Sequence, residues 1–318
     1  KLPFIGGNSR IGKSETIICE ACEYVDSFLK IYPSISIILN IEADHLDYFK
    51  NLDNIIKSFH KFASQTSNLV IINGDDKNCI AASQNINAGI LTFGMSKNND
   101  YYIENLKKTN GAFYAYTLMH HGKKVIDIKL SVPGKHNVLN SLAAAATAHC
   151  MGIDKNVIKD SLMEFHGVHR RFEVLGSPNN ITIVDDFAHH PTEIKTTLET
   201  AMSMGFNHVF AVFQPHTYSR TAEFLDSFAS SLSIADTVVL SEILAVREKN
   251  IYNIYSEDLA AKMKNCVYRK TFEEITDYIE KTAKPGDLVL TMGGGNVYVC
   301  ANMILDRLSK NHIIKNTN

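Results

Sequence analysis

Residues 7 to 14 read Gly-Asn-Ser-Arg-Ile-Gly-Lys-Ser, which matches the pattern of a phosphate-binding loop. Such a loop holds phosphate when a strand enters it and a helix leaves it, because backbone N–H groups and the helix dipole then converge on the anion. Here residues 15–22 are apolar and β-branched, which is typical of a strand, and the strand before the loop would contain only residues 2–5, with Pro3 inside it. We therefore interpret the match as a coincidence.

Cys19 and Cys22 have the spacing of a redox or zinc motif. They lie in residues 16–22, which predict a buried strand, and residues three apart on a strand point to opposite faces. No second cysteine pair completes a zinc site, so the two cysteines are interpreted as structural. The 6 cysteines are scattered through the chain, which favours a reducing cytoplasm over a disulfide framework.

A carboxylate and an imidazole accompany the first two predicted strands. Glu20 lies in residues 16–22, where its apolar neighbours Ile17 and Ile18 argue against full exposure. His45 comes just after residues 35–40, at the carboxyl end of the second predicted strand, where open α/β sheets bind ligands. Oxygen and imidazole donors at such a place suit Mg²⁺. The alternative for His45 is an ordinary residue at a helix start.

Amide and guanidinium groups stand at two further turns. Asn137 and Asn140 open an alanine-rich helix one turn apart, so they share a face that could meet a purine edge, although asparagine is also a routine N-cap. Arg170 and Arg171 follow Gly167, and the planar fork of arginine suits phosphate. An arginine pair in a solvated linker is the alternative.

Polar residues also follow the strands of the second half of the chain. Asp186 and His189 end one strand, in the segment Val-Asp-Asp-Phe-Ala-His-His-Pro at 184–191. His216 and Arg220 follow the next strand at a helix start, where Arg220 would supply a fixed positive charge for a carboxylate. The run of glycines at 293–295 is only a weak phosphate-turn signal, since no third spaced glycine follows.

Strands alternating with amphipathic helices position these residues and predict an α/β fold with mainly parallel sheets. Residues 113–119 and 125–132 predict an antiparallel hairpin at a sheet edge. We expect two domains: an ATP-binding domain over residues 1–166, P-loop-NTPase-like and incomplete at its N-terminus, and a Rossmann-like domain over 167–318. The strands are expected at residues 16–22, 35–40, 69–73, 90–93, 181–185, 208–213, 237–241 and 287–292. The helices are expected at 53–64, 138–151, 192–204, 219–231, 256–263, 272–282 and 297–308.

Composition excludes several classes of protein. Lys plus Arg number 32 against 34 Asp plus Glu, and no long basic run occurs, so the chain does not resemble a nucleic-acid-binding protein. No apolar stretch approaches the roughly 20 residues of a membrane helix. No signal-peptide pattern opens the chain. The absence of an initiator methionine predicts that the chain is a fragment.

Five segments in order resemble the Mur ligase family. They are residues 20–49 (EACEYVDSFLKIYPSISIILNIEADHLDYF), 133–140 (PGKHNVLN), 167–173 (GVHRRFE), 184–191 (VDDFAHHP) and 213–221 (FQPHTYSRT). The resemblance covers nearly the whole chain and is closest to the branch that joins L-alanine to UDP-N-acetylmuramate during peptidoglycan precursor synthesis. It implies an ATP- and Mg²⁺-dependent reaction through an acyl phosphate, with an ATP-binding central domain followed by an amino-acid-binding domain.

The resemblance also implies roles for single residues. Glu20 and His45 would be the catalytic metal ligands, and His189 would lie beside the incoming amino acid. His216 and Arg220 would hold the carboxylate of that amino acid. The nucleotide would contact Asn137, Asn140, Arg171 and Asp186.

The chain departs from the family pattern at a few positions. Phe187 stands where tyrosine is usual, and Thr217 stands where arginine is usual. Neither Lys57 nor Lys61 aligns with the carbamylated lysine of related ligases. The UDP-binding domain and the Gly-Lys-Thr phosphate loop are expected to be missing, which predicts an inactive fragment. The alternatives are a ligase that adds a whole tripeptide to the same sugar nucleotide, and a non-catalytic nucleotide-binding module.

Overall fold

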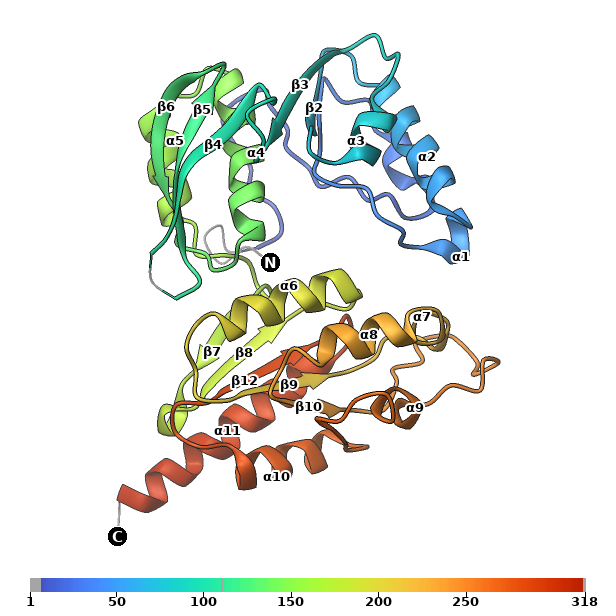
Figure 1. The fold of residues 1–318 in the computed structure, drawn as a ribbon, viewed down its shortest axis with the longest axis vertical. Coiled ribbons are helices and arrows are strands. Elements are labelled where there is room, and N and C mark those ends of the chain that lie inside the picture. The colour runs from blue at the N-terminus through green and yellow to red at the C-terminus, as the bar shows by residue number, and fades with distance from the viewer. Residues whose placement is uncertain (1–6, 110, 317–318) are drawn as a thin grey trace.

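The chain folds around two six-stranded sheets that lie in separate halves of the molecule (Figure 1). The computed structural model describes residues 7–109 and 111–316. The first sheet has the strand order β1-β2-β3-β4-β5-β6 and the second the order β11-β10-β9-β12-β8-β7. Helices cover both faces of each sheet, which confirms the predicted α/β class.

The first sheet changes from parallel to antiparallel at β4. Strands β1 to β4 run parallel, and β5 and β6 return antiparallel as the hairpin expected at the sheet edge. The strands are β1 (Ile35–Ile38), β2 (Leu69–Asn73), β3 (Gly89–Gly94), β4 (Tyr101–Lys108), β5 (Tyr114–His120) and β6 (Lys123–Lys129). The helices of this half are the 3-10 helix η2 (Tyr24–Lys30), α1 (Leu46–Phe49), α2 (Leu52–Ser64), α3 (Lys77–Ala82), α4 (His136–Cys150) and α5 (Lys155–Glu164).

Alternating residues of β2 build two separate cores. Val70 and Ile72 face η2, α2 and α3, whereas Ile71 faces α4 and α5. All three side chains are fully buried, because a strand covered on both faces places every side chain in a core. Helix α2 buries Ile55 and Phe62 on one face and carries its charged residues on the other, as the 3.6-residue period of an amphipathic helix requires.

The second sheet is parallel except for its edge strand β7, which pairs antiparallel with β8. The strands are β7 (Glu173–Gly176), β8 (Thr182–Asp186), β9 (Val209–Phe213), β10 (Thr237–Leu240), β11 (Cys266–Tyr268) and β12 (Leu288–Met292). The helices are the 3-10 helix η3 (Pro178–Asn180), α6 (Pro191–Met202), α7 (Tyr218–Glu223), α8 (Leu225–Leu232), α9 (Ser256–Ala260), α10 (Phe272–Thr282) and α11 (Val297–Asn316).

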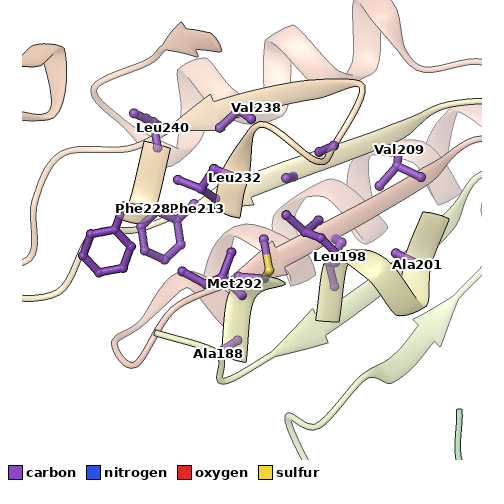
Figure 2. Packing of buried hydrophobic residues seen from close by; sticks show 14 of the residues in the cluster. Ala188, Leu198, Ala201, Val209, Phe213, Phe228, Leu232, Val238, Leu240 and Met292 are labelled. Carbon is purple, nitrogen blue, oxygen red and sulfur yellow. The ribbon is translucent and has the colours of Figure 1, made fainter. Parts of the chain in front are cut away.

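Strand β9 shows how this sheet separates two helix layers. Val209, Ala211 and Phe213 pack with α6 and α8 in the core of Figure 2, whereas Phe210 and Val212 pack with α10 and α11 on the other face. The carboxyl ends of the parallel strands therefore open on one edge, where the polar residues 185–190 and 214–220 follow β8 and β9.

Two element predictions are wrong. Residues 16–22 form no strand: they have no regular secondary structure, with Ile17 89% and Ile18 91% exposed. β-Branched residues favour strands through packing on sheet neighbours, and none of the described strands lies beside this stretch. The helix expected over 219–231 is broken at Phe224, which ends α7 and caps α8.

The sequence also left elements unassigned. Strands β4, β7 and β11 and helix α3 were not predicted. Strands β7 and β11 and helix α3 are short, whereas β4 is an 8-residue interior strand whose second half is polar, which dilutes the apolar pattern. No helix within the described ranges is long and apolar enough to cross a membrane. The division of the chain at residues 166 and 167 falls between the two sheets and stays a prediction.

Candidate functional site

A cleft of about 700 Å³ runs between the two halves of the molecule. Its walls come from the loop after β1, the start of α4, the segment 165–172 that joins the halves, and the start of α6. The polar residues that line it are Glu23, Asn40, Glu42, Asp44, His45, His136, Asn137, Asn140, His166, Arg171, Asp186, His190, Thr192, Glu193, Thr196 and Thr197. It therefore gathers predicted site residues from both halves of the chain.

His45 lies in this cleft as the N-cap of α1, with a left-handed backbone. Its Nε2 is 3.4 Å from Glu23 Oε1 and 3.7 Å from Asp44 Oδ2. The hydrogen bond that the His45 imidazole donates to the Glu23 carboxylate raises the pKa of His45 above its usual value, and the same contact lowers the pKa of Glu23. The imidazole is thus paired with carboxylates at the carboxyl end of β1, where the sequence placed it.

Glu20, the other predicted metal ligand, is exposed and is not among the residues that line the cleft. The apolar neighbours that argued against its exposure are themselves exposed, so that expectation is wrong. Glu23 stands beside His45 instead. Sequence reasoning missed Glu23, although a signal was present: it is a second carboxylate three residues after Glu20 in the same segment.

A metal ion beside His45 would need further donor atoms around it. Mg²⁺ binds through one or two carboxylates while keeping waters and substrate phosphates, so Glu23 and His45 suit it without a complete protein cage. In residues 7–109 and 111–316, no group of three or more His, Cys, Asp or Glu side chains has the arrangement of a metal centre. An ion here would therefore need oxygens from a bound nucleotide as well.

Asn137 and Asn140 lie in the first turns of α4 and face the cleft. Asn137 does not cap the helix: Lys135 holds that place without a side-chain bond, and the Asn137 amide donates to Pro133 O at 2.7 Å. The Asn140 amide donates to Asn137 Oδ1 at 3.1 Å. The two side-chain amides are thus hydrogen-bonded to each other, and both residues line the cleft.

The two adjacent arginines have different surroundings. Arg170 is 12% exposed, and its guanidinium donates to Asp185 Oδ2 at 2.7 Å and to the carbonyls of Gly293 and Gly295 at 2.9 Å each. Arg171 is 51% exposed, lines the cleft, and its guanidinium forms a long ion pair with Glu193 at 3.4 Å. Arg170 is therefore a structural brace, and Arg171 is the arginine whose guanidinium is available to a ligand.

The Phe187 ring contacts both arginines. It lies 5.0 Å from the guanidinium carbon of Arg170 and 5.8 Å from that of Arg171. It also meets the ring of His189 edge-on at 5.2 Å. These contacts use the aromatic face, which phenylalanine keeps where the family usually has tyrosine.

Asp186 is 5% exposed and ends β8 at the floor of the cleft. Its two carboxylate oxygens accept from the backbone N–H groups of Phe172 and Ala188, each at 2.7 Å. Burial nevertheless raises the pKa of Asp186 to about 6. The hydrogen bond from Phe172 connects the joining segment to the second sheet. The contact of Asp186 with the nucleotide stays a prediction.

His189, His216 and Arg220 gather behind the cleft. The rings of His189 and His216 are 6.1 Å apart, and burial lowers the pKa of both imidazoles, which favours their neutral forms. His216 Nδ1 is buried without a hydrogen-bond partner. Arg220 NH2 donates to Asp44 Oδ1 at 2.9 Å, which joins the second half of the molecule to the first.

Thr217 has a local role that the sequence did not indicate. It is the N-cap of α7, and its hydroxyl accepts from the backbone N–H of Arg220. Its φ of 66° is unusual for a β-branched residue, so the turn that presents Arg220 is strained. Thr217 therefore positions Arg220.

Residues 293–295 form a tight turn against these side chains. A Cβ on Gly295 would lie 2.3 Å from Leu244 and 2.7 Å from Gln214 Oε1, and one on Gly294 would lie 3.1 Å from His189. The glycines thus allow the turn to pack on the His189 and His216 side of the site, and two of their carbonyls hold Arg170.

Comparison with known proteins gives matches across both halves. The family model of the Mur ligase middle domain matches residues 8–148, and that of the Mur ligase, glutamate ligase domain matches residues 170–295. The chain is 42% identical over 312 residues to "UDP-N-acetylmuramate--L-alanine ligase" of Caldanaerobacter subterraneus subsp. tengcongensis, covering 96% of this chain and 68% of the relative. It is 44% identical over 310 residues to the protein of the same name from Caldicellulosiruptor saccharolyticus, covering 95% of this chain and 68% of that protein.

A solved structure extends the likeness to the fold. The crystal structure of UDP-N-acetylmuramate-alanine ligase MurC from Thermotoga maritima matches with a TM-score of 0.72 and 28% sequence identity. The match covers 90% of this chain and 62% of the solved chain. The chain thus spans about two thirds of the length of its curated relatives and somewhat less of this solved protein.

Proposed function

Because the chain belongs to the Mur ligase family, we propose that the protein of which it forms part joins L-alanine to the lactyl carboxylate of UDP-N-acetylmuramate, using ATP. The reaction serves peptidoglycan precursor synthesis and belongs in the cytoplasm. The observation that carries the proposal is the cleft, where Asn137, Asn140 and His45 of the first half face Arg171 and Asp186 of the second.

The proposed chemistry has two steps. A carboxylate oxygen of the sugar nucleotide attacks the γ-phosphorus of ATP, and ADP leaves. The alanine amine then attacks the acyl carbon of the resulting acyl phosphate, and inorganic phosphate leaves. Both steps bring negative oxygens together, so positive charge and fixed donors around them carry most of the catalysis.

The nucleotide is assigned to four residues that line the cleft. The connected amides of Asn137 and Asn140 offer donors and an acceptor to the adenine edge or to neighbouring groups of the nucleotide. Arg171 offers an exposed guanidinium to phosphate oxygens. Asp186 fixes the backbone of the joining segment and, with its free lone pairs, contacts the nucleotide.

Mg²⁺ would be held by His45 and a carboxylate, and when bound it would neutralise the charge that develops on the transferring phosphate. Glu20 remains the ligand that the family resemblance suggests, and the contact of Glu23 with His45 makes Glu23 a second candidate. Both carboxylates belong to residues 20–23, which precede η2. A small shift of this segment would therefore replace one carboxylate by the other beside His45.

The amino acid is assigned to the turn that opens α7. Arg220 would hold the alanine carboxylate through paired hydrogen bonds, with His216 and His189 nearby in their neutral forms. Burial favours the uncharged form of these imidazoles, so either could accept the proton that the alanine nitrogen loses when its amine attacks the acyl carbon.

The proposal is tested by following ADP release and sugar-nucleotide product in the protein that contains this chain. UDP-N-acetylmuramate, Mg-ATP and a panel of amines are supplied: L-alanine, glycine, L-serine and the tripeptide L-alanyl-D-glutamyl-diaminopimelate. Product with L-alanine and none with the tripeptide supports the proposal. Product with the tripeptide alone would assign the chain to the tripeptide-adding ligases, and ATP binding without any product would favour a binding module.

A further inference from the structure

The carboxylate-binding arginine of the proposed amino-acid site already holds a carboxylate. Arg220 NH2 donates to Asp44 Oδ1 at 2.9 Å, and Asp44 belongs to the loop after β1 in the other half of the molecule. The Arg220 side chain is 14% exposed and that of Asp44 is 32% exposed. An aspartate carboxylate has the same chemistry as the α-carboxylate of an amino acid, so the two compete for the same guanidinium.

Asp44 is the member of this ion pair that borders the cleft. Asp44 is among the residues that line the cleft, and Arg220 is not. An amino acid arriving from the cleft therefore meets Asp44 first, and its carboxylate reaches the guanidinium only where Asp44 has moved away.

The position of Asp44 is fixed from its own side as well. Its Oδ1 accepts from the backbone N–H of His45 at 2.7 Å, and its Oδ2 lies 3.7 Å from His45 Nε2. Arg220 is fixed in turn by the Thr217 cap of α7. Asp44 thus connects the proposed metal residue to the proposed amino-acid residue through a single side chain.

We propose that Asp44 is a positioning residue that occupies the guanidinium of Arg220 until the carboxylate of the amino-acid substrate displaces it. This inference rests on the proposed function, because it takes Arg220 as the amino-acid site. Displacement exchanges one ion pair for another, so a ligand with a free carboxylate keeps Arg220 paired. A ligand without a carboxylate, such as L-alaninamide, would leave the largely buried guanidinium without an anionic partner, and this disfavours its binding.

The test follows the Arg220 guanidinium directly by NMR of arginine-labelled protein, with its resonance assigned by its disappearance in Arg220→Lys. L-alanine and L-alaninamide are titrated separately into the wild type, Asp44→Asn and Asp44→Glu. We expect Asp44→Asn to bind L-alanine about fivefold more tightly than the wild type, because the competing charge is gone. Asp44→Glu keeps a competing carboxylate and should behave like the wild type, and L-alaninamide should bind none of them.

Glu42→Gln is the matched control. Glu42 comes from the same loop and lines the same cleft, but its carboxylate accepts from Thr192 Oγ1 at 3.0 Å instead of pairing with Arg220. Removing this charge should leave the affinity for L-alanine unchanged. An equal gain in Glu42→Gln would show that the loop's overall charge acts, and this would overturn the role of Asp44.

The outcomes separate the inference from the proposed function. A response of Arg220 to L-alanine with equal or weaker affinity in Asp44→Asn keeps the amino-acid site and overturns the inference alone. No response of Arg220 to L-alanine in any variant overturns the amino-acid site and the inference together. Equal tightening for L-alanine and L-alaninamide would show that the carboxylate is not what is recognised, which also rejects the inference.

Discussion

Replacing Arg170 and Arg171 separately by alanine should separate a structural brace from a ligand residue. Arg170→Ala removes the charged partner of Asp185, whose side chain is 2% exposed and keeps only the hydroxyl of Thr291 at 2.6 Å, and frees the carbonyls of Gly293 and Gly295. Removing one partner of a buried ion pair costs about 3–5 kcal/mol, because the other charge is left without compensation. Burial already raises the pKa of Asp185, so that carboxylate depends on Arg170.

Arg171→Ala should behave in the opposite way. Its guanidinium is 51% exposed, its ion pair with Glu193 is long at 3.4 Å, and the Phe187 ring lies 5.8 Å away, so its loss should cost less than about 0.5 kcal/mol of stability. If Arg171 binds nucleotide phosphate, the same change removes a charged hydrogen bond and weakens ATP binding by about tenfold or more.

Scanning calorimetry and titration calorimetry measure the two effects. At roughly 2–4 °C per kcal/mol for a unit of 150–250 residues, Arg170→Ala should lower the unfolding midpoint of the second half by about 10 °C. Titration of a non-hydrolysable ATP analogue should show weaker binding for Arg171→Ala at an unchanged midpoint. Equal loss of stability in both variants, or an Arg170→Ala midpoint within 2 °C of the wild type, would refute the distinction.

Three further predictions concern single contacts. Glu23→Gln should lower the pKa of His45, because the hydrogen bond that raises it is weakened, whereas Glu20→Gln should leave it unchanged; imidazole NMR titration measures both, and equal shifts would contradict the pairing. Burial raises the pKa of Asp186 to about 6 from 3.8, so the folded state binds the proton more tightly, and this residue's contribution to stability should fall by about 2 kcal/mol as pH rises from 4 to 6. A wild-type minus Asp186→Asn difference in unfolding free energy that does not fall over this range would refute that assignment. Gly295→Ala should cost about 1–3 kcal/mol because its Cβ meets Leu244 at 2.3 Å, whereas Gly12→Ala, with nothing within 4 Å, should be neutral in denaturant unfolding; equal costs would show that crowding is not the cause.

Strands with continuous apolar runs were the elements that could be predicted. Residues 69–73 and 208–213 were recognised and form β2 and β9, because a strand buried on both faces shows an unbroken apolar sequence. Residues 16–22 have the same pattern and form no strand. A strand is completed only by its neighbours in the sheet, and the sequence of the segment alone carries no information about them.

Chain order and local chemistry also predicted which residues would approach the cleft. Asn137, Asn140, Arg171, Asp186 and His45 all line it, because helix starts and strand ends of parallel sheets open on one edge. Their contacts with nucleotide and metal remain predictions. The identity of the neighbours, such as Glu23 beside His45, could not be derived from spacing, since it depends on the path of residues 20–30 in space.

By itself, the sequence determined the α/β class, the family and the order of the motifs, because these depend on periodicity and on residue types within short segments. Only the tertiary structure decided which member of a neighbouring pair faces the cleft. Arg170 and Arg171 are adjacent in sequence, yet one is buried among carbonyls and the other is exposed. Asp44 and Arg220 are 176 residues apart and form an ion pair. Such contacts depend on the packing of distant elements, which no local pattern records.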